Sequence, residues 1–223
     1  VITLNMIDYS YSVVRADSYY MVGGVYGWNA ESASKVAFYN ESGSKASITT
    51  QWTGDANLKI WNRASIGNWD VAWGSVTDGE KSMEGALINS GANAFVCPEK
   101  GAYYTLTIDM VAKTYSWTKL DNQSPEAFNT VSLIGGFNEW KGDVDMEQTA
   151  PHNWYVNHTF SSDTEMKFRS NHDWTISWGG KATSLAGMIY TAEANGDNIV
   201  IPAGTYDIYF NDITHQFMFV KAN

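Results

Sequence analysis

The stretch VGGVYGWN at residues 22–29 recurs as IGGFNEWK at residues 134–141, a shift of 112 positions from Trp28 to Trp140. Ordered repetition of this kind is typical of a duplicated domain. It predicts two copies, residues 18–121 and 128–223, joined by the polar linker DNQSPE at residues 121–126. Three further blocks recur in the same order: WTGDANLKIW (52–61) as FSSDTEMKFR (160–169), NWDVAWG (68–74) as DWTISWG (173–179), and CPEKGAY (97–103) as IPAGTY (201–206).

The first residues of the chain resemble the end of the first copy. VITLNMIDYSYSV at residues 1–13 is similar to TLTIDMVAKTYSW at residues 105–117. We therefore expect residues 1–17 to be a closing hairpin or linker from a truncated upstream module. The alternative is a chance likeness between two alternating strand–turn–strand segments.

Both copies are predicted to consist of strands. Short β-branched and aromatic segments such as LKIW (58–61), TLTI (105–108) and YDIYF (206–210) are bounded by Gly, Asn, Asp or Pro. Long amphipathic helical windows are lacking, and residues 82–92 and 183–194 could hold at most a short helical turn. The prediction is an all-β chain of two tandem immunoglobulin-like β-sandwiches.

Composition narrows the possible partners. The 223 residues are 44% apolar and 17% charged, enough apolar material for a sizeable core, and the net charge is −10. A negative field repels phosphate and anionic lipid, so nucleic acid is not expected as a partner. No stretch reads as a transmembrane segment, and the single cysteine, Cys97, excludes an internal disulfide. Ten tryptophans exceed what the core requires, so some are expected at the surface.

The segments LKIW (58–61) and MKFR (166–169) are predicted to turn cations and indoles outward. Strand alternation directs Met166 and Phe168 to the core and Lys167 and Arg169 to solvent. An indole face can stack on the C–H face of a pyranose, and lysine, arginine or asparagine can bond its hydroxyls. The pattern therefore favours a sugar-binding surface, although a core role for any single tryptophan is equally open. The first copy likewise places Leu58 and Ile60 inward and Lys59 and Trp61 outward.

Catalytic and metal sites are weakly supported. The acids that recur between the copies are expected in turns, and no recurring pair suggests a hydrolase. The stretch DVDME (143–147) could hold calcium but lacks the length and glycine of a known calcium loop, so a solvated turn is favoured. No cofactor and no metal are expected. The recurring acids are Asp55 and Asp163, and Asp109 and Asp212.

Three segments carry a family resemblance: GGFNEW (135–140), MKFRSNHDWTISWGG (166–180) and IPAGTYDIYF (201–210). They resemble the tandem carbohydrate-binding modules of SusE/SusF-like outer-membrane starch-binding proteins of Bacteroidetes. The second copy fits over nearly its whole length. The first departs from the pattern, with Val25-Tyr26 where Phe-Asn is usual, Trp61 where arginine is usual, and a longer insertion at residues 75–94.

The resemblance implies a non-catalytic lipoprotein at the cell surface that binds starch or maltooligosaccharides beside SusC/SusD-like transporter proteins. Its lipid anchor is expected upstream of Val1. Alternatives are a different polysaccharide, or a structural or protein-interaction module of an outer-membrane glycan-uptake complex. By motif position, the second copy would bind through Trp140, Trp174 and Trp178 as aromatic platforms with Lys167, Arg169 and Asn171 as donors, and the first through Trp28, Trp61 and Trp69 with Lys59, Asn62 and Arg63.

Overall fold

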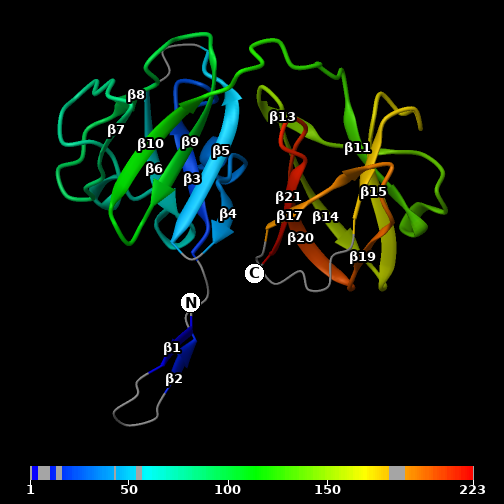
Figure 1. Ribbon diagram of the computed structural model, residues 1–223. Coiled ribbons are helices and arrows are strands. Elements are labelled where there is room, and N and C mark those ends of the chain that lie inside the picture. Colours follow the sequence, from blue (N-terminus) through cyan, green and yellow to red (C-terminus); the bar gives the residue numbers. More distant parts are fainter. Residues whose placement is uncertain are drawn as a thin grey trace.

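The computed structural model describes residues 2–4, 11–13, 17–42, 44–53, 57–180 and 189–222. The two repeats lie side by side, the first in blue to green and the second in green to red (Figure 1). Asp55, expected in a turn, lies outside the described residues, as does most of the segment 1–17.

The first repeat is a sandwich of two antiparallel sheets. One sheet has the order β4-β5-β9-β10-β7 and the other β3-β6-β8. Alternation in β9 turns Leu106 and Ile108 into the space between the sheets, where they pack with Leu58, Ile60 and Phe95 of the opposite sheet. The strands are β3 (Tyr19–Gly23), β4 (Tyr39–Ser42), β5 (Lys45–Gln51), β6 (Asn57–Asn62), β7 (Glu84–Ala86), β8 (Phe95–Val96), β9 (Tyr103–Asp109) and β10 (Thr114–Lys119).

The second repeat has an equivalent five-stranded sheet, and its other sheet repeats the β3-β6-β8 arrangement as β11-β15-β19 with further strands added. Its sheets run β13-β14-β20-β21-β17 and β12-β11-β15-β16-β18, with β19 also paired to β15. The core between them contains Phe168 stacked on Phe210 at 4.5 Å between ring centroids. The predicted all-β fold is confirmed. The strands are β11 (Val131–Gly135), β12 (Val144–Asp145), β13 (Glu147–Ala150), β14 (Asn153–Phe160), β15 (Thr164–Ser170), β16 (Ser177–Gly179), β17 (Ile189–Thr191), β18 (Glu193–Ala194), β19 (Ile199–Ile201), β20 (Gly204–Asn211) and β21 (Gln216–Lys221).

Helical structure is short and lies in the loops that follow β3, β6 and β11. These loops contain α1 (Ala30–Ser34), the 3-10 turns η1 (Arg63–Ser65) and η2 (Trp69–Val71), and η3 (Gly136–Asn138). Asn29 caps α1, its Oδ1 accepting from the Ser32 amide at 2.9 Å. Within the described part of the chain, no helix has the length and apolar character needed to cross a membrane.

A hairpin begins the chain. β1 (Ile2–Leu4) pairs with β2 (Tyr11–Val13), and Ile2 lies opposite Val13. In the hairpin of β9 and β10, Leu106 lies opposite Trp117. The alignment of residues 1–13 with 105–117 equates Ile2 with Leu106 and Val13 with Trp117, so the two hairpins have the same register. The predicted hairpin is therefore present. Its origin in an upstream module, and the module boundaries near residues 17, 121 and 128, stay predictions.

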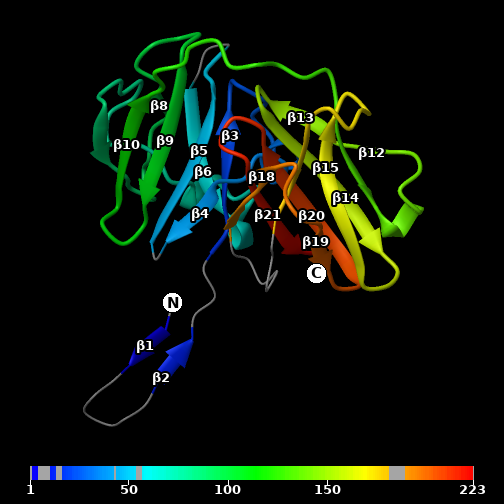
Figure 2. The same ribbon diagram turned by 45° about the vertical axis from the view of Figure 1, so that its right-hand side comes forward.

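The two repeats are packed against each other. An apolar interface cluster combines Tyr20, Ala37 and Tyr39 of the first repeat with Tyr209, Met218 and Val220 of the second. Figure 2 shows the sheet containing β4 and β5 beside β20 and β21. The contact between repeats is thus a buried surface with its own apolar centre.

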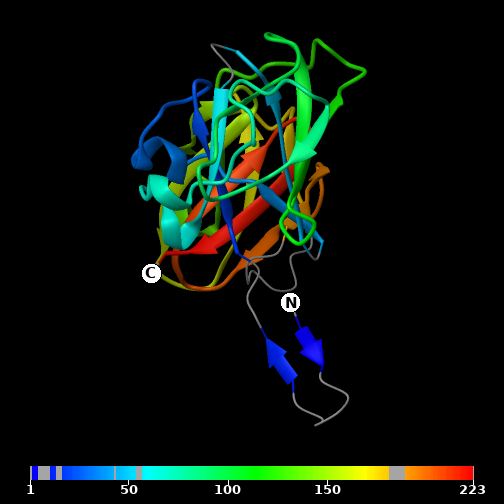
Figure 3. The ribbon, with the colours of Figure 1, turned by 90° about the vertical axis from the view of Figure 1, so that its left-hand side faces the viewer.

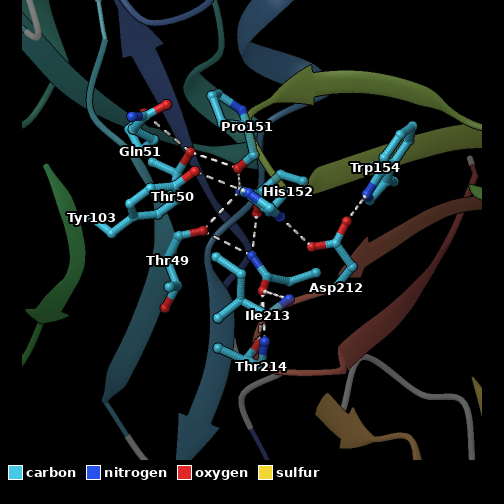
Figure 4. A network of polar contacts seen from close by, with 12 residues as sticks. Thr49, Thr50, Gln51, Tyr103, Pro151, His152, Trp154, Asp212, Ile213 and Thr214 are labelled. Carbon is cyan, nitrogen blue, oxygen red and sulfur yellow. Dashed lines mark hydrogen bonds and ion pairs between the residues drawn. The ribbon is translucent and has the colours of Figure 1, made fainter. Parts of the chain in front are cut away.

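Hydrogen bonds between buried polar groups also link the two repeats (Figure 4). His152 lies between the Tyr103 hydroxyl, at 3.2 Å from Nε2, and the Asp212 carboxylate, at 2.6 Å from Nδ1. Asp212 lies in the turn between β20 and β21, as predicted, and its carboxylate also accepts a hydrogen bond from the Trp154 indole at 2.7 Å. The side-chain hydrogen bonds within this turn come from Asn211, whose Oδ1 accepts from the Ile213 and Thr214 amides.

Candidate functional site

Four tryptophans are exposed, and they form two pairs. Trp28 and Trp69 lie with ring centroids 6.3 Å apart and ring planes inclined by 34°. Trp140 and Trp174 occupy the equivalent positions of the second repeat, 6.1 Å apart and inclined by 41°. We call these the first and second Trp pairs. Their exposed fractions range from 36% for Trp140 to 47% for Trp174, which confirms the expectation that some indoles lie at the surface.

The first glycine of each repeated Gly-Gly places the loop that carries the first indole. A Cβ on Gly23 would lie 2.2 Å from the Asn57 carbonyl oxygen, and one on Gly135 would lie 2.2 Å from that of Glu165. Only glycine allows the end of β3 or β11 to come this close to the neighbouring strand. The repeat therefore preserves the geometry from which Trp28 and Trp140 project.

Both loops of the second Trp pair contain residues with positive φ. Glu139 and Trp140 have φ of 56° and 58°, and Asn171 and His172 have φ of 51° and 56°. Such conformations are costly for residues other than glycine and persist where surrounding contacts hold them. Here the Trp140 amide donates to the Gly135 carbonyl at 2.8 Å. These loops are therefore held in one conformation that exposes the indoles.

Arg169 lies behind Trp174 rather than in solvent. Its guanidinium carbon lies 4.8 Å from the centre of the Trp174 ring, and its Nε and Nη2 donate to the Asp143 carboxylate at 2.7 and 2.6 Å. The residue is 8% exposed. The expectation that Arg169 faces solvent is wrong, because Asp143 and Trp174 cover it. A cation against the ring supports the indole.

We expect Asp143→Asn to lower the free energy of unfolding by about 1–3 kcal/mol near neutral pH, because the covered guanidinium loses its charged partner. The hydrogen bond from Arg169 holds the pKa of the Asp143 carboxyl below its ordinary value of 3.8. A lowered folded-state pKa means that this contribution exists above the ordinary pKa and is lost as the pH falls through the folded one. Urea unfolding of both proteins should give a difference that is steady near neutrality and shrinks below about pH 4. An undiminished difference in acid would contradict this assignment.

Trp61 and Trp178 do not offer a ring face to solvent. Trp61 is 0% and Trp178 2% exposed, so the prediction that they are platforms is corrected. Trp61 is the first-repeat equivalent of Arg169. It lies under Trp69, with the two ring centroids 4.4 Å apart. Trp178 packs in the second core against Phe210 at 5.1 Å. Each supports the fold or an exposed indole from beneath.

Some of the predicted hydrogen-bond donors have no partner within the described part of the protein, and others are already bonded to protein groups. Lys59 and Lys167 are half-buried at matching positions of β6 and β15 and have no polar partner among the described residues. Asn171 accepts the Asn129 amide through Oδ1 at 3.0 Å, which leaves its NH2 group as a donor. These three side chains remain available to a ligand.

The other two donors of the first repeat are less available. Arg63 forms an ion pair with Asp207 of the second repeat at 3.7 Å. Asn62 buries its Oδ1 without a hydrogen-bond partner in the described part of the molecule. Their contribution to binding stays a prediction.

Sequence reasoning missed the acids that support the second Trp pair. Asp145 binds His172 Nε2 at 2.5 Å, beside the Asp143–Arg169 pair. Glu147 instead contacts Lys35 of the first repeat at 2.9 Å. The three acids of DVDME therefore bind three different basic side chains, and the described residues contain no cluster suited to a metal ion. No local pattern joins these acids to their partners, because His172 lies in the loop after β15 and Lys35 lies after α1 in the other repeat.

Comparison with known proteins shows which family the chain is similar to. Residues 14–119 match the family model described as "SusF, first starch specific CBM". Over 217 residues the chain is 25% identical to the outer membrane protein SusF of Bacteroides thetaiotaomicron, covering 90% of this chain and 43% of that protein. The chain is therefore similar to the SusE/SusF-like proteins. It spans less than half the length of this curated relative.

The matched model describes a starch-specific carbohydrate-binding module, and residues 14–119 are similar to it. The match falls on the first repeat, whose sequence departs from the usual pattern at Val25, Tyr26 and Trp61. A crystal structure of SusF from Bacteroides thetaiotaomicron is similar over 95% of this chain and 50% of that one, with a TM-score of 0.42 and 19% identity.

Proposed function

We propose that the chain binds starch or maltooligosaccharides without catalysis, and that the first and second Trp pairs are the binding platforms. The observation that carries the proposal is their repetition: two exposed indoles, similarly spaced and inclined, at equivalent positions of two repeats. Core packing does not require four exposed indoles, whereas stacking on sugar rings does.

The inclination of the rings favours an α-glucan. Successive glucose units of an α-1,4 chain turn along a curved path, whereas a β-1,4 chain is a flat ribbon that suits coplanar rings. Ring planes inclined by 34° and 41° fit the curved chain. Lys59 and Lys167, and the NH2 group of Asn171, would bond the glucose hydroxyls at the edge of each platform.

The outer membrane surface is the location indicated by the likeness to an outer membrane protein. There, two platforms on one chain would bind an insoluble polymer more tightly than either alone, although each shallow platform binds weakly. We also propose SusC/SusD-like transporter proteins as partners.

Affinity electrophoresis tests the proposed ligand. We expect the protein to be retarded in gels that contain amylopectin or pullulan and to run freely in gels that contain xylan. Retardation by xylan alone would assign a different polysaccharide. Free migration in every gel, with co-purification of a transporter protein, would favour an interaction module instead. Reducing-sugar release from amylopectin would contradict the non-catalytic assignment.

A further inference from the structure

The loop that carries Trp28 is held by the second repeat. Glu147 at the start of β13 accepts a hydrogen bond from the Tyr26 hydroxyl and another from Lys35 Nζ at 2.9 Å. Tyr209 of β20 donates from its hydroxyl to the Ser34 carbonyl, at the end of α1, at 2.8 Å. Contacts to the second repeat therefore lie on both sides of Trp28 along the chain.

The segment that carries Trp69 also rests on the second repeat. Trp69 lies on Trp61, which is buried with Val22, Ala33 and Ala72. Ile66 packs both against this cluster and against the interface cluster that contains Tyr209. Figure 3 shows α1, in blue, and the teal turns η1 and η2 on the same side of the first repeat. A continuous line of packed side chains thus runs from the exposed Trp69 ring into the second repeat.

The second Trp pair is supported differently. Its described supports all belong to the second repeat: Asp143 holds Arg169 behind Trp174, Asp145 binds His172, and Asn171 accepts the Asn129 amide. Among the described residues, none of these contacts comes from the first repeat. The two pairs are therefore alike in geometry and unlike in what holds them.

We propose that the second repeat is a positioning element for the first Trp pair, with Glu147 as its central positioning residue. The inference rests on the proposed function of that pair. Glu147 joins Tyr26 and Lys35, which lie before and after Trp28, so one carboxylate fixes both ends of the loop. Holding a loop in its bound conformation raises affinity because less ordering remains for the ligand to impose. The first site is thus complete only when the two repeats are docked.

The charge state of Glu147 agrees with this role. Hydrogen bonds from Tyr26 and then Lys35 hold the pKa of its carboxyl below the ordinary value. The carboxylate is therefore ionised, and able to accept both hydrogen bonds, throughout the neutral range. Its side chain is still 48% exposed, so its removal opens no cavity.

The test uses the full chain with Trp174→Ala, which leaves the first Trp pair as the site that is titrated. Adding Glu147→Ala should weaken maltoheptaose binding by about tenfold, because the binding-competent loop conformation becomes less populated. Glu99→Ala is the matched control: it removes a comparable exposed ion pair, to Lys119 at 2.5 Å, wholly within the first repeat. The control should bind as the parent does, and all three proteins should melt at similar temperatures.

Hydrogen–deuterium exchange supplies a readout that needs no glycan. Glu147→Ala should speed exchange in residues 24–35 and 63–71 and leave residues 136–142 and 171–176 unchanged. In a Trp28→Ala/Trp69→Ala chain, the same substitution should not alter maltoheptaose binding at the second pair. A general loss of protection would indicate a merely structural role and overturn the inference.

The failures are distinguishable. The proposed function of the first pair fails if the Trp174→Ala parent does not bind maltoheptaose, or if its binding survives a further Trp69→Ala substitution. In that case hydrogen–deuterium exchange alone decides the inference. If the parent binds, but Glu147→Ala and Glu147→Ala/Tyr209→Phe bind equally well with unchanged exchange, the positioning role is wrong.

Discussion

Trp174→Ala is expected to abolish measurable glucan binding at the second Trp pair while leaving the fold intact. Truncating a stacked aromatic costs about 1–3 kcal/mol of binding, which is roughly a five- to 150-fold loss of affinity. A weak site would fall below detection. The indole is 47% exposed and rests on Arg169, so its removal leaves the core between the sheets unchanged.

Calorimetric titration with maltoheptaose in a Trp28→Ala/Trp69→Ala chain isolates this site, and a thermal melt accompanies it. Trp174→Phe is the matched control, because it keeps a ring for stacking and should retain part of the affinity. Lys167→Ala is the companion variant: it should weaken binding through lost hydroxyl contacts without altering stability. Unchanged affinity after Trp174→Ala, or a collapsed melting temperature, would mean that Trp174 is a packing residue.

Trp178→Ala should have the opposite profile. Trp178 is buried in the second core against Phe128, at 5.4 Å, and Phe210. Truncating an indole in a packed core costs about 3–5 kcal/mol, which lowers the melting temperature of a chain of this size by roughly 10 °C. Thermal and urea unfolding measure the change.

The contrast with Trp174→Ala is the control, since both variants remove the same side chain from neighbouring positions of one motif. Below its melting temperature, Trp178→Ala should still bind maltoheptaose at the first Trp pair. A melting temperature like that of the unaltered protein would show that Trp178 is not part of the core.

The duplication and the strands were predictable because they depend on local pattern. The shift from Trp28 to Trp140 predicted the repeat, and the strand order of the two repeats agrees with it. Alternation also placed Leu58, Ile60, Met166 and Phe168 in the cores. The inward placement follows from the two-residue period of a strand, which is visible within each of these short segments.

The error at Trp61 has a physical cause. Alternation correctly turns this residue away from the core between the sheets, but the outer face of β6 is itself covered by α1 and by the segment after η1. Arg169 is likewise turned outward and then covered, in its case by Asp143 and Trp174. The period of a strand assigns a side chain to a face and does not say what lies over that face.

The sequence by itself therefore determined the all-β duplicated architecture, the glycine positions and the set of aromatic and basic residues from which a site is built. The tertiary structure decided which indoles are exposed, that Arg169 supports Trp174, and that Glu147 holds the loop of Trp28. The reason is separation along the chain: Glu147 and Tyr26 are 121 residues apart. Contacts over such a distance arise only when the two repeats pack, and no local pattern encodes them.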